Sequence, residues 1–404
     1  MKWESQLKVG KITSRSRTTM NDVIKVRDVL LLNERVFSIC DAWPLKKSYM
    51  NFVIYASYLT VHMVIMYMDL FDALGNLKAM VDNIIDSTVA TATYLLLFLL
   101  RFSKLIKQAI IVVKQEIAES KFEDVEEMRL YLAYHNISYK FSRYAAPTTT
   151  TLVVLLYLLP MLQLAMSDLG KGNGTSNAYV LPFRVHAFFD YQEDFRVFIF
   201  MYLYQFPLVF IALCHISAVS LVLSMVLHVC GKFSILSYRI KNITAISQVN
   251  LDSKIKELVI AHIKIMMTAN SINSALQIFL LIDLIQTTIR MAIVTYMMLV
   301  NPDENFVSRF TYSLYMTLIT SILFLYCFMG ERLSHESSKV WEAYFDTDWH
   351  NLSIHDQKSM LLVMSSGRQI MHVTAGKLYT FSLIGFIGVV KTAFGYVSLL
   401  RALT

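Results

Sequence analysis

The sequence contains little charge and none of the short motifs that mark common enzymes. Only 17% of its 404 residues are charged and 55% are hydrophobic, whereas ~25% charged residues is usual in a soluble domain. No P-loop, His-Glu-x-x-His, Gly-x-Ser-x-Gly or Cys-x-x-Cys pattern occurs. We therefore expect a membrane protein that is not an enzyme, with no cofactor and no metal ion.

Cysteine, glycine and proline are also scarce, with 4, 12 and 6 residues. No cysteine lies in a segment predicted to be extracellular, which argues against an external disulfide. So few glycines and prolines leave no pair of broken spans, a feature expected of many transporters. The net charge of +7 is scattered over several segments, so no nucleic acid partner is expected.

Seven long apolar runs are the main positive feature. Each supplies about 20 mostly apolar residues, enough for a helix to cross ~30 Å of hydrocarbon. The runs are too long and too continuously apolar for barrel strands. They occupy residues 50–68, 84–100, 148–166, 197–230, 274–300, 310–329 and 378–400. The predicted fold is an all-α membrane protein with seven transmembrane helices.

The distribution of lysine and arginine predicts the orientation. Most of the 37 basic residues fall in the N-terminal segment and in the loops after spans two, four and six, while the alternate loops contain few. Basic loops stay on the cytoplasmic side. The N-terminus is therefore predicted to be cytoplasmic, and seven spans place the C-terminus outside.

The predicted organisation has four parts. Residues 1–47 form a polar cytoplasmic segment without the apolar stretch of a signal peptide. Residues 48–329 contain spans one to six, with a ligand pocket in their outer half. Residues 330–377 form a cytoplasmic helical anchor, and residues 378–404 form the last span.

Tyrosine, phenylalanine and methionine cluster in the outer halves of spans two, three, four and six. Tyrosine is common at membrane interfaces, which explains part of this pattern. The alternative is a cavity for a small, mostly apolar molecule, since no charged group is expected there to pair with an ion. The predicted ligand-binding residues are Tyr94, Tyr157, Met161, Tyr202, Phe206, Tyr312, Tyr315 and Met316.

Two further patterns raise specific expectations. The helical period after span six predicts a helix from about Ser334 to Thr374, in which Tyr344 and Trp349 anchor neighbouring subunits. Ordinary packing within one subunit is the alternative. Within the spans, Asp283 and Arg290 share a helix face, and such groups usually face the protein interior or water.

The C-terminal third carries a family resemblance. Gly330-Glu331, Glu336-Ser337, Tyr344 and Trp349 precede the segment Thr374-Ala375-Gly376-Lys377-Leu378, which continues through Phe381-Ser382-Leu383, Phe386, Lys391-Thr392 and Leu399-Leu400-Arg401. This ordered set resembles the signature of insect odorant receptors. Leu181-Pro182 and the spacing of Tyr202 and Gln205 fit the same family, so the resemblance covers nearly the whole chain.

The resemblance implies a function. It implies an odorant receptor subunit of a heteromeric, ligand-gated, non-selective cation channel, in the plasma membrane of olfactory sensory neurons. The short second cytoplasmic loop is similar to that of ligand-specific subunits rather than of the coreceptor. The implied partners are the odorant receptor coreceptor, forming a tetramer, a small volatile ligand and membrane lipid.

The resemblance also implies roles for individual residues. The last span would line the pore, with Tyr396, Leu399 and Leu403 on one face as a hydrophobic gate. Asn173 begins a glycosylation sequon in the second extracellular loop. A seven-span G-protein-coupled-type receptor is the main alternative, and a transporter is the next. The predicted cytoplasmic N-terminus disfavours the first.

Overall fold

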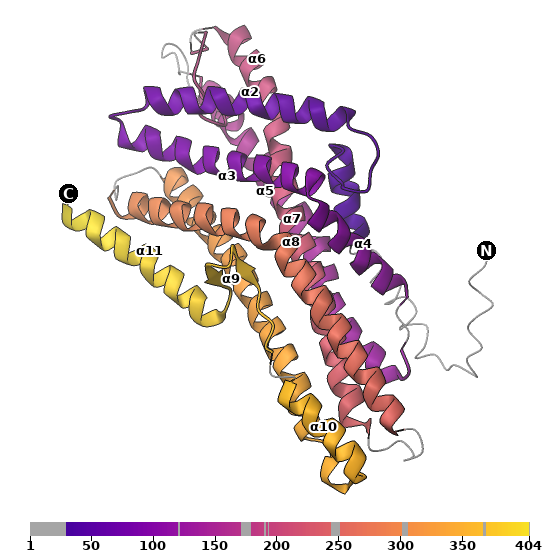
Figure 1. Ribbon diagram of the computed structural model, residues 1–404. Helices are drawn as coiled ribbons and strands as arrows, with labels where there is room; N and C mark the ends of the chain where they lie inside the picture. The colour runs from indigo at the N-terminus through magenta and orange to yellow at the C-terminus, as the bar shows by residue number, and fades with distance from the viewer. Residues whose placement is uncertain are drawn as a thin grey trace.

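The computed structural model describes residues 30–119, 122–170, 179–189, 191–192, 194–243, 251–300, 306–366 and 369–403. The chain is mostly helical (Figure 1). Six described helices are long and apolar enough to cross a membrane, and a shorter apolar helix covers Leu383–Gly395. The predicted helical membrane fold is thereby confirmed.

The principal helices follow the predicted apolar runs and extend beyond most of them. Helix α3 begins at Leu77, where the Asn76 side chain accepts a hydrogen bond from the Ala79 amide, and Ser103 in the same way caps α4. The helices are α2 (Met50–Asp72), α3 (Leu77–Phe102), α4 (Lys104–Ala118), α5 (Val125–Gly170), α6 (Phe195–Gln205), α7 (Val209–Lys241), α8 (Leu251–Val300), α9 (Phe306–Phe345), α10 (Ile354–Ser366) and α11 (Leu383–Leu403).

We expected the fourth apolar run to form one span. It is not one uninterrupted helix. A 3₁₀ turn, η1 (Phe206–Leu208), separates α6 from α7. Pro207 lies in this turn, and proline cannot donate the amide hydrogen bond that a continuous α-helix would need. Helix α6 packs against α5, and α7 packs against α5, α8 and α9.

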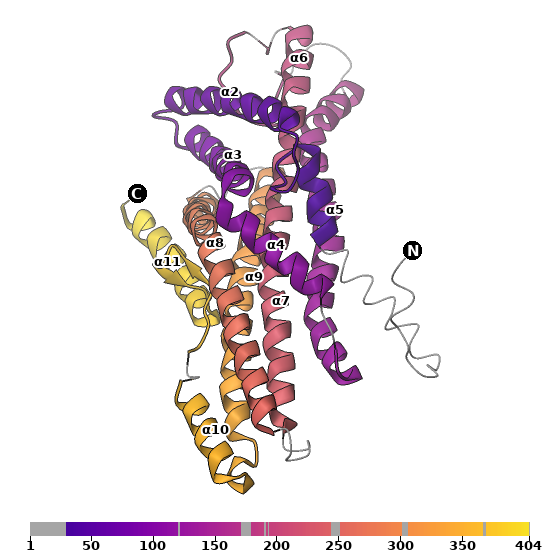
Figure 2. The same ribbon diagram turned by 45° about the vertical axis from the view of Figure 1, so that its right-hand side comes forward.

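Helix α7 forms the centre of the bundle. In its most apolar stretch 83% of the residues are buried, compared with 6% in the corresponding stretch of α5. The long lower parts of α5, α8 and α9 lie around α7, while α2 and α3 run across the other end of the molecule (Figures 1 and 2). Thus α7 is surrounded by protein, whereas most apolar residues of α5 are left exposed to contact lipid.

The predicted continuous helix from Ser334 to Thr374 is wrong. Helix α9 ends at Phe345, a short turn η4 (Trp349–Asn351) follows, and α10 begins at Ile354. Ser353 caps the N-terminus of α10. Its hydroxyl accepts a hydrogen bond from the Asp356 amide and donates one to the Asp356 carboxylate. The Trp341 indole donates to the carbonyl oxygen of Met364 at 3.0 Å and fastens α10 to α9.

A small hairpin precedes the last helix, which starts at Leu383 rather than at residue 378. Strands β1 (Thr374–Ala375) and β2 (Tyr379–Thr380) pair in antiparallel fashion around a turn at Gly376 and Lys377. Both turn residues have positive φ. The hairpin is bonded to α8, since the Gly376 amide donates to the Gln277 carbonyl and the Thr374 amide donates to the Asn273 side chain. We name residues 374–380 the hairpin joint.

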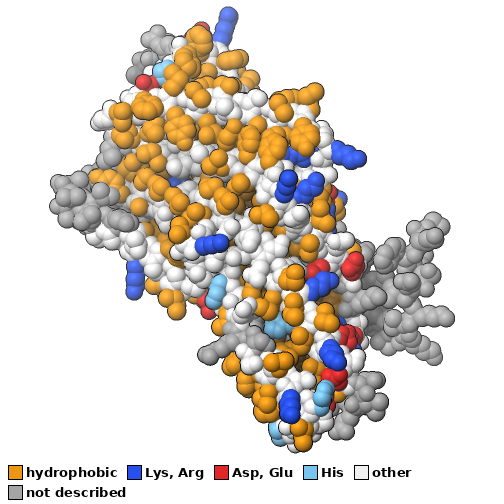
Figure 3. All heavy atoms as spheres, in the orientation of Figure 1, with side chains coloured by type: hydrophobic (Ala, Val, Ile, Leu, Met, Phe, Trp, Pro, Cys, Tyr) orange, Lys and Arg blue, Asp and Glu red, His pale blue; other side chains and the backbone are white. Residues whose placement is uncertain are grey.

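The surface divides along the length of the molecule. In Figure 3, hydrophobic side chains cover most of the upper part of the visible face, over α2 and α3, and charged side chains gather over the lower part. Arg101 lies in the last turn of α3. Its guanidinium donates to the carbonyl oxygens of Trp43, Lys46 and Ser48, at 2.7, 2.8 and 2.8 Å. This arrangement fits an apolar part in lipid and a polar part in water.

Candidate ligand cavity

A cavity of ≈ 390 Å³ lies between α3, α9 and the loop that precedes α6. This size falls within the usual range for small-molecule sites. Helix α3 contributes Asp82, Ile85 and Asp86, and α9 contributes Thr311, Tyr312 and Tyr315. The loop contributes Val180, Leu181, Pro182, Phe183, Arg184 and Tyr191.

The loop over the cavity is fixed at several points. Arg184 forms an ion pair with Asp69 of α2 at 2.8 Å, and Asn83 of α3 donates to the same carboxylate at 2.8 Å. The side chain of Gln205 exchanges two hydrogen bonds with the backbone of Phe183, at 3.1 and 2.8 Å. These bonds connect α2, α3 and α6 through the loop, so the cavity has a defined cover.

The cavity wall combines aromatic rings with carboxylates. The Tyr312 hydroxyl donates to Asp82 at 2.9 Å, which holds the Tyr312 ring between α9 and α3. Asp86 lies one turn further along α3 and also lines the cavity. Charged groups thus line this cavity, whereas we expected none near the ligand site.

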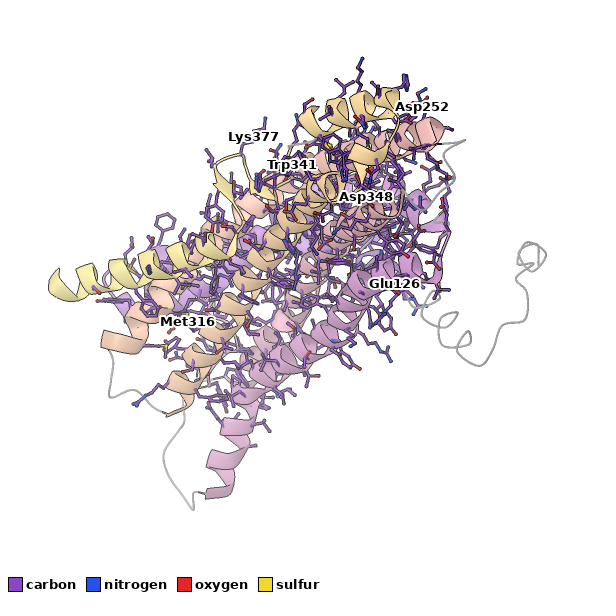
Figure 4. All side chains as sticks on the ribbon, turned by 90° about the horizontal axis from the view of Figure 1, so that it is seen from below. Glu126, Asp252, Met316, Trp341, Asp348 and Lys377 are labelled. Carbon is purple, nitrogen blue, oxygen red and sulfur yellow. The ribbon has the colours of Figure 1, made fainter. Side chains whose placement is uncertain are left out.

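The structure brings two of the eight predicted ligand-binding residues, Tyr312 and Tyr315, to this cavity. Met316 follows them on α9 and packs against the main core. Figure 4 shows Met316 far along α9 from Trp341. Tyr94 instead lies beside α2, where its hydroxyl shares a hydrogen bond with Thr60 at 3.0 Å.

Tyr157 and Tyr202 form a separate cluster between α5 and α6. Each hydroxyl donates to the backbone carbonyl of the other residue, and the ring centroids are 4.7 Å apart. Met161 packs against this cluster, and the exposed Phe206 contacts the Tyr157 ring edge to face. These four residues satisfy one another's packing and do not line the cavity described above.

The predicted channel and anchor residues are placed as follows. Tyr396, Leu399 and Leu403 belong to α11, but their side chains lie outside the described residues, and so does Asn173. Tyr344 is buried within the chain at 1% exposure, near His262, whereas Trp349 in η4 is partly exposed. Of the two proposed anchor residues, only Trp349 offers surface to a partner.

Sequence reasoning missed the acidic residues and the cover loop. Asp82 and Asp86 lie four residues apart on either side of Ile85, so they share a face at the start of an apolar helix. Carboxylates in that position usually face water or a cavity, which is the signal that could have identified them. The loop carries no comparable pattern, because its contacts to Asp69 and Gln205 depend on the tertiary fold.

A second polar cluster lies toward the other end of the bundle. Glu116 of α4 accepts hydrogen bonds from His228 of α7 at 2.9 Å and from Thr268 of α8 at 3.1 Å. The other ring nitrogen of His228 bonds the Tyr131 hydroxyl of α5 at 2.9 Å. Burial alone would raise the pKa of Glu116, but His228, Lys232 and Thr268 together bring this pKa below its ordinary value.

The membrane-length helices define a multi-pass helical membrane protein, and its cavity has the size usual for small-molecule sites. A family model described as 7tm Odorant receptor matches residues 169–394, more than half of the chain. The chain therefore belongs to the odorant receptor family.

Individual relatives agree with this assignment. The chain is 22% identical to Odorant receptor 82a of Drosophila melanogaster over 204 residues, covering 50% of this chain and 52% of that protein. It is 26% identical to the odorant receptor coreceptor of Aedes aegypti over 144 residues, covering 36% of this chain and 30% of the coreceptor. The chain thus spans about half or less of the length of these curated relatives. The longer match to a receptor other than the coreceptor fits a ligand-specific subunit.

The fold is shared with a solved insect olfactory receptor. OR5 from Machilis hrabei superimposes with a TM-score of 0.80, at 13% identity, over 95% of this chain and 100% of that chain. A second structure, of the same receptor in complex with eugenol, gives a TM-score of 0.76 over 96% of this chain and 98% of that chain. At this identity the likeness establishes the fold alone.

Proposed function

We propose that this chain is the ligand-binding subunit of an odorant-gated, non-selective cation channel. The observation that carries the proposal is the covered cavity between α3 and α9, lined by Tyr312 and Tyr315. The receptor with the same fold has been solved with eugenol, a small aromatic molecule, and this supports a ligand of similar size. Ligand in the cavity would stabilise one arrangement of α3 and α9 over another and so shift the open fraction.

The orientation and partners follow from the sequence pattern and the family. The N-terminus lies in the cytoplasm, the C-terminus lies outside, and the cavity opens in the outer half of the plasma membrane of a sensory neuron. The coreceptor is the proposed partner in a tetramer, since coreceptors are among the relatives. The proposed organisation keeps residues 1–47, 48–329, 330–377 and 378–404 as cytoplasmic segment, spans one to six, anchor and pore helix.

The test is electrical recording from cells that express the chain with and without the coreceptor, under G-protein block. Odorant-evoked cation current that needs the coreceptor and survives the block supports the proposal. A response that needs G-proteins would favour a G-protein-coupled-type receptor instead. Tyr315→Ala should shift the odorant dose-response, while Tyr144→Ala, at an exposed site on α5, should leave it unchanged.

Assembly is tested separately at Trp349, the partly exposed member of the proposed anchor pair. Trp349→Ala should lower the yield of heteromer that co-purifies with the coreceptor, because tryptophan often dominates interface energies. His350→Ala, at the exposed neighbouring position, is the matched control. An unchanged tetramer yield in Trp349→Ala would remove this residue from the interface.

A further inference from the structure

We propose that an anionic phospholipid of the inner membrane leaflet binds where α2 begins and α3 ends. Its phosphate is held by the ammonium groups of Lys47, Lys104 and Lys107, which we name the lysine patch. Its acyl chains lie against exposed apolar residues beside the patch. The assignment to the inner leaflet rests on the proposed orientation of the chain, whereas the lipid site rests on the positions and charges of these residues.

The lysine patch lies at the ends of two membrane-length helices. A candidate span starts at the first residue of α2, and another ends at the last residue of α3. Arg101 of α3 holds these ends together, because its guanidinium donates to the carbonyl oxygens of the residues on either side of Lys47. Lys104 is the first residue of α4, and Lys107 follows one helical turn later. The three lysines thus lie just beyond the apolar spans, at the depth of phospholipid headgroups.

The charge of the lysine patch is not balanced within the described chain. All three lysines are exposed, and none forms an ion pair with a carboxylate in the part of the chain that the structure describes. Two other lysines of the same region do form such pairs, Lys46 with Asp41 and Lys114 with Glu34. In Figure 3, basic side chains gather at the right-hand edge of the hydrophobic area over α2 and α3. Unpaired lysines beside a membrane surface attract anionic lipid.

Several exposed basic residues at the polar end of the bundle are arranged differently. Arg129, Lys254 and Lys256 each pair with a carboxylate three or four residues away on the same helix. Lys241 of α7 pairs with Asp346, just after the end of α9. These basic residues are balanced by acidic neighbours within the chain, whereas the lysine patch leaves its charge for an anion from outside the chain.

Exposed apolar side chains beside the patch suit the acyl chains of a lipid. Tyr49 and Met50 at the start of α2, and Phe102 and Leu105 where α3 meets α4, are each more than half exposed. The Tyr49 ring lies 3.9 Å from the Arg101 guanidinium, which fixes the ring at this level. Tyrosine is enriched at membrane interfaces because its ring is apolar and its hydroxyl is polar. Ammonium groups next to apolar surface favour a phospholipid over a soluble phosphate.

The experiment titrates the purified full-length chain in neutral detergent and measures its unfolding temperature. The probes are short-chain phosphatidylserine, phosphatidylcholine of the same chain length, and glycerophosphoserine, which has the anionic headgroup without acyl chains. Phosphatidylserine should give the largest rise. The combined variant Lys47→Gln, Lys104→Gln and Lys107→Gln should raise its half-maximal concentration more than about tenfold, since one lysine near an anionic surface changes affinity about fivefold. Arginine at the same three positions should retain the preference.

The matched control is the combined variant Arg129→Gln, Lys254→Gln and Lys256→Gln, which removes the same charge at the polar end. It should keep the preference for phosphatidylserine. Equal shifts with both lipids in the unmodified chain would overturn the proposal, as would an unchanged titration in the lysine-patch variant or equal weakening in both variants. An equal shift with glycerophosphoserine would also overturn it, because the acyl chains would then be unnecessary.

The titration is independent of channel activity. Absent odorant-evoked current with a selective phosphatidylserine shift would overturn the proposed function and leave the lipid site standing. Normal current without a selective shift would have the opposite meaning.

Discussion

The two polar clusters of the bundle differ in how far their side chains bind one another. Around Glu116, the carboxylate, the His228 ring and two hydroxyl groups bind one another, and the cluster connects α4, α5, α7 and α8. Around Asp82 and Asp86, the polar groups border a cavity of ≈ 390 Å³. Glu116 and Tyr131 also border a smaller pocket of ≈ 140 Å³, so the difference lies in the bonding: the groups around Glu116 bind one another from four helices, whereas Asp82 and Asp86 line a larger cavity.

The largest effect should follow from breaking the saturated cluster. Glu116→Ala leaves His228 and Thr268 without their acceptor inside the bundle, and removing one partner of a buried pair costs about 3 kcal/mol. We expect a strong drop in the unfolding temperature of the purified receptor and a loss of surface expression. Glu119→Ala removes an exposed carboxylate three residues away and serves as the control. Equal stability of the two variants would contradict a structural role for the cluster.

A smaller effect should follow from one hydroxyl of the tyrosine cluster. Tyr202→Phe removes the bond from the buried Tyr202 hydroxyl to the Tyr157 carbonyl, and such a bond contributes about 1 kcal/mol. The unfolding temperature should fall by a few degrees, while the odorant dose-response stays in place because neither ring lines the cavity. A shifted dose-response at normal stability would instead place this pair in the ligand site.

The cover of the cavity should have a weaker influence still. Arg184→Ala removes the ion pair to Asp69 but leaves the Gln205 bonds to Phe183. Arg184 is 44% exposed, so the pair contributes below about 1 kcal/mol, and the half-maximal odorant concentration should rise about threefold. Current decay after odorant removal should be faster by a similar factor. Arg196→Ala, at an exposed position on α6, should change neither quantity.

The smallest predicted effect concerns pH and the residues before α2. The Lys46 ammonium and the Ser48 hydroxyl lower the pKa of Asp41 below its ordinary value. A carboxyl whose pKa is lowered by folding stabilises the protein above its ordinary pKa, and this contribution is lost as pH falls through the lowered value. Stability between pH 6 and pH 3 should therefore decline slightly less in Asp41→Asn than in the unmodified receptor. Parallel thermal-unfolding curves that coincide at every pH would exclude the contribution.

Much of the fold was predictable because membrane-length helices need long apolar runs, and these are visible in the sequence. The tyrosine spacing on α9 was equally informative, since Tyr312 and Tyr315 lie three residues apart and reach the same cavity. Periodicity reports which residues share a face but not which distant segment covers it. The break after Phe345 depends on the Ser353 cap, and the hairpin joint depends on bonds to Asn273. The helical period alone therefore predicted one helix where α9 and α10 are separate, and it placed the start of the last helix too early.

The hairpin joint also restricts how such receptors can diversify. A side chain at Gly330 would collide with the carbonyl oxygen of Phe381, and one at Gly376 would meet Leu281. The joint thus fits α8, α9 and α11 together with no spare volume, whereas the cavity wall has room for exchange. New ligand preferences can then arise by mutation around Tyr312 and Asp86 without altering the connection to the last helix. We therefore expect related receptors to differ quickly in the residues of the cavity wall and slowly in those of the hairpin joint.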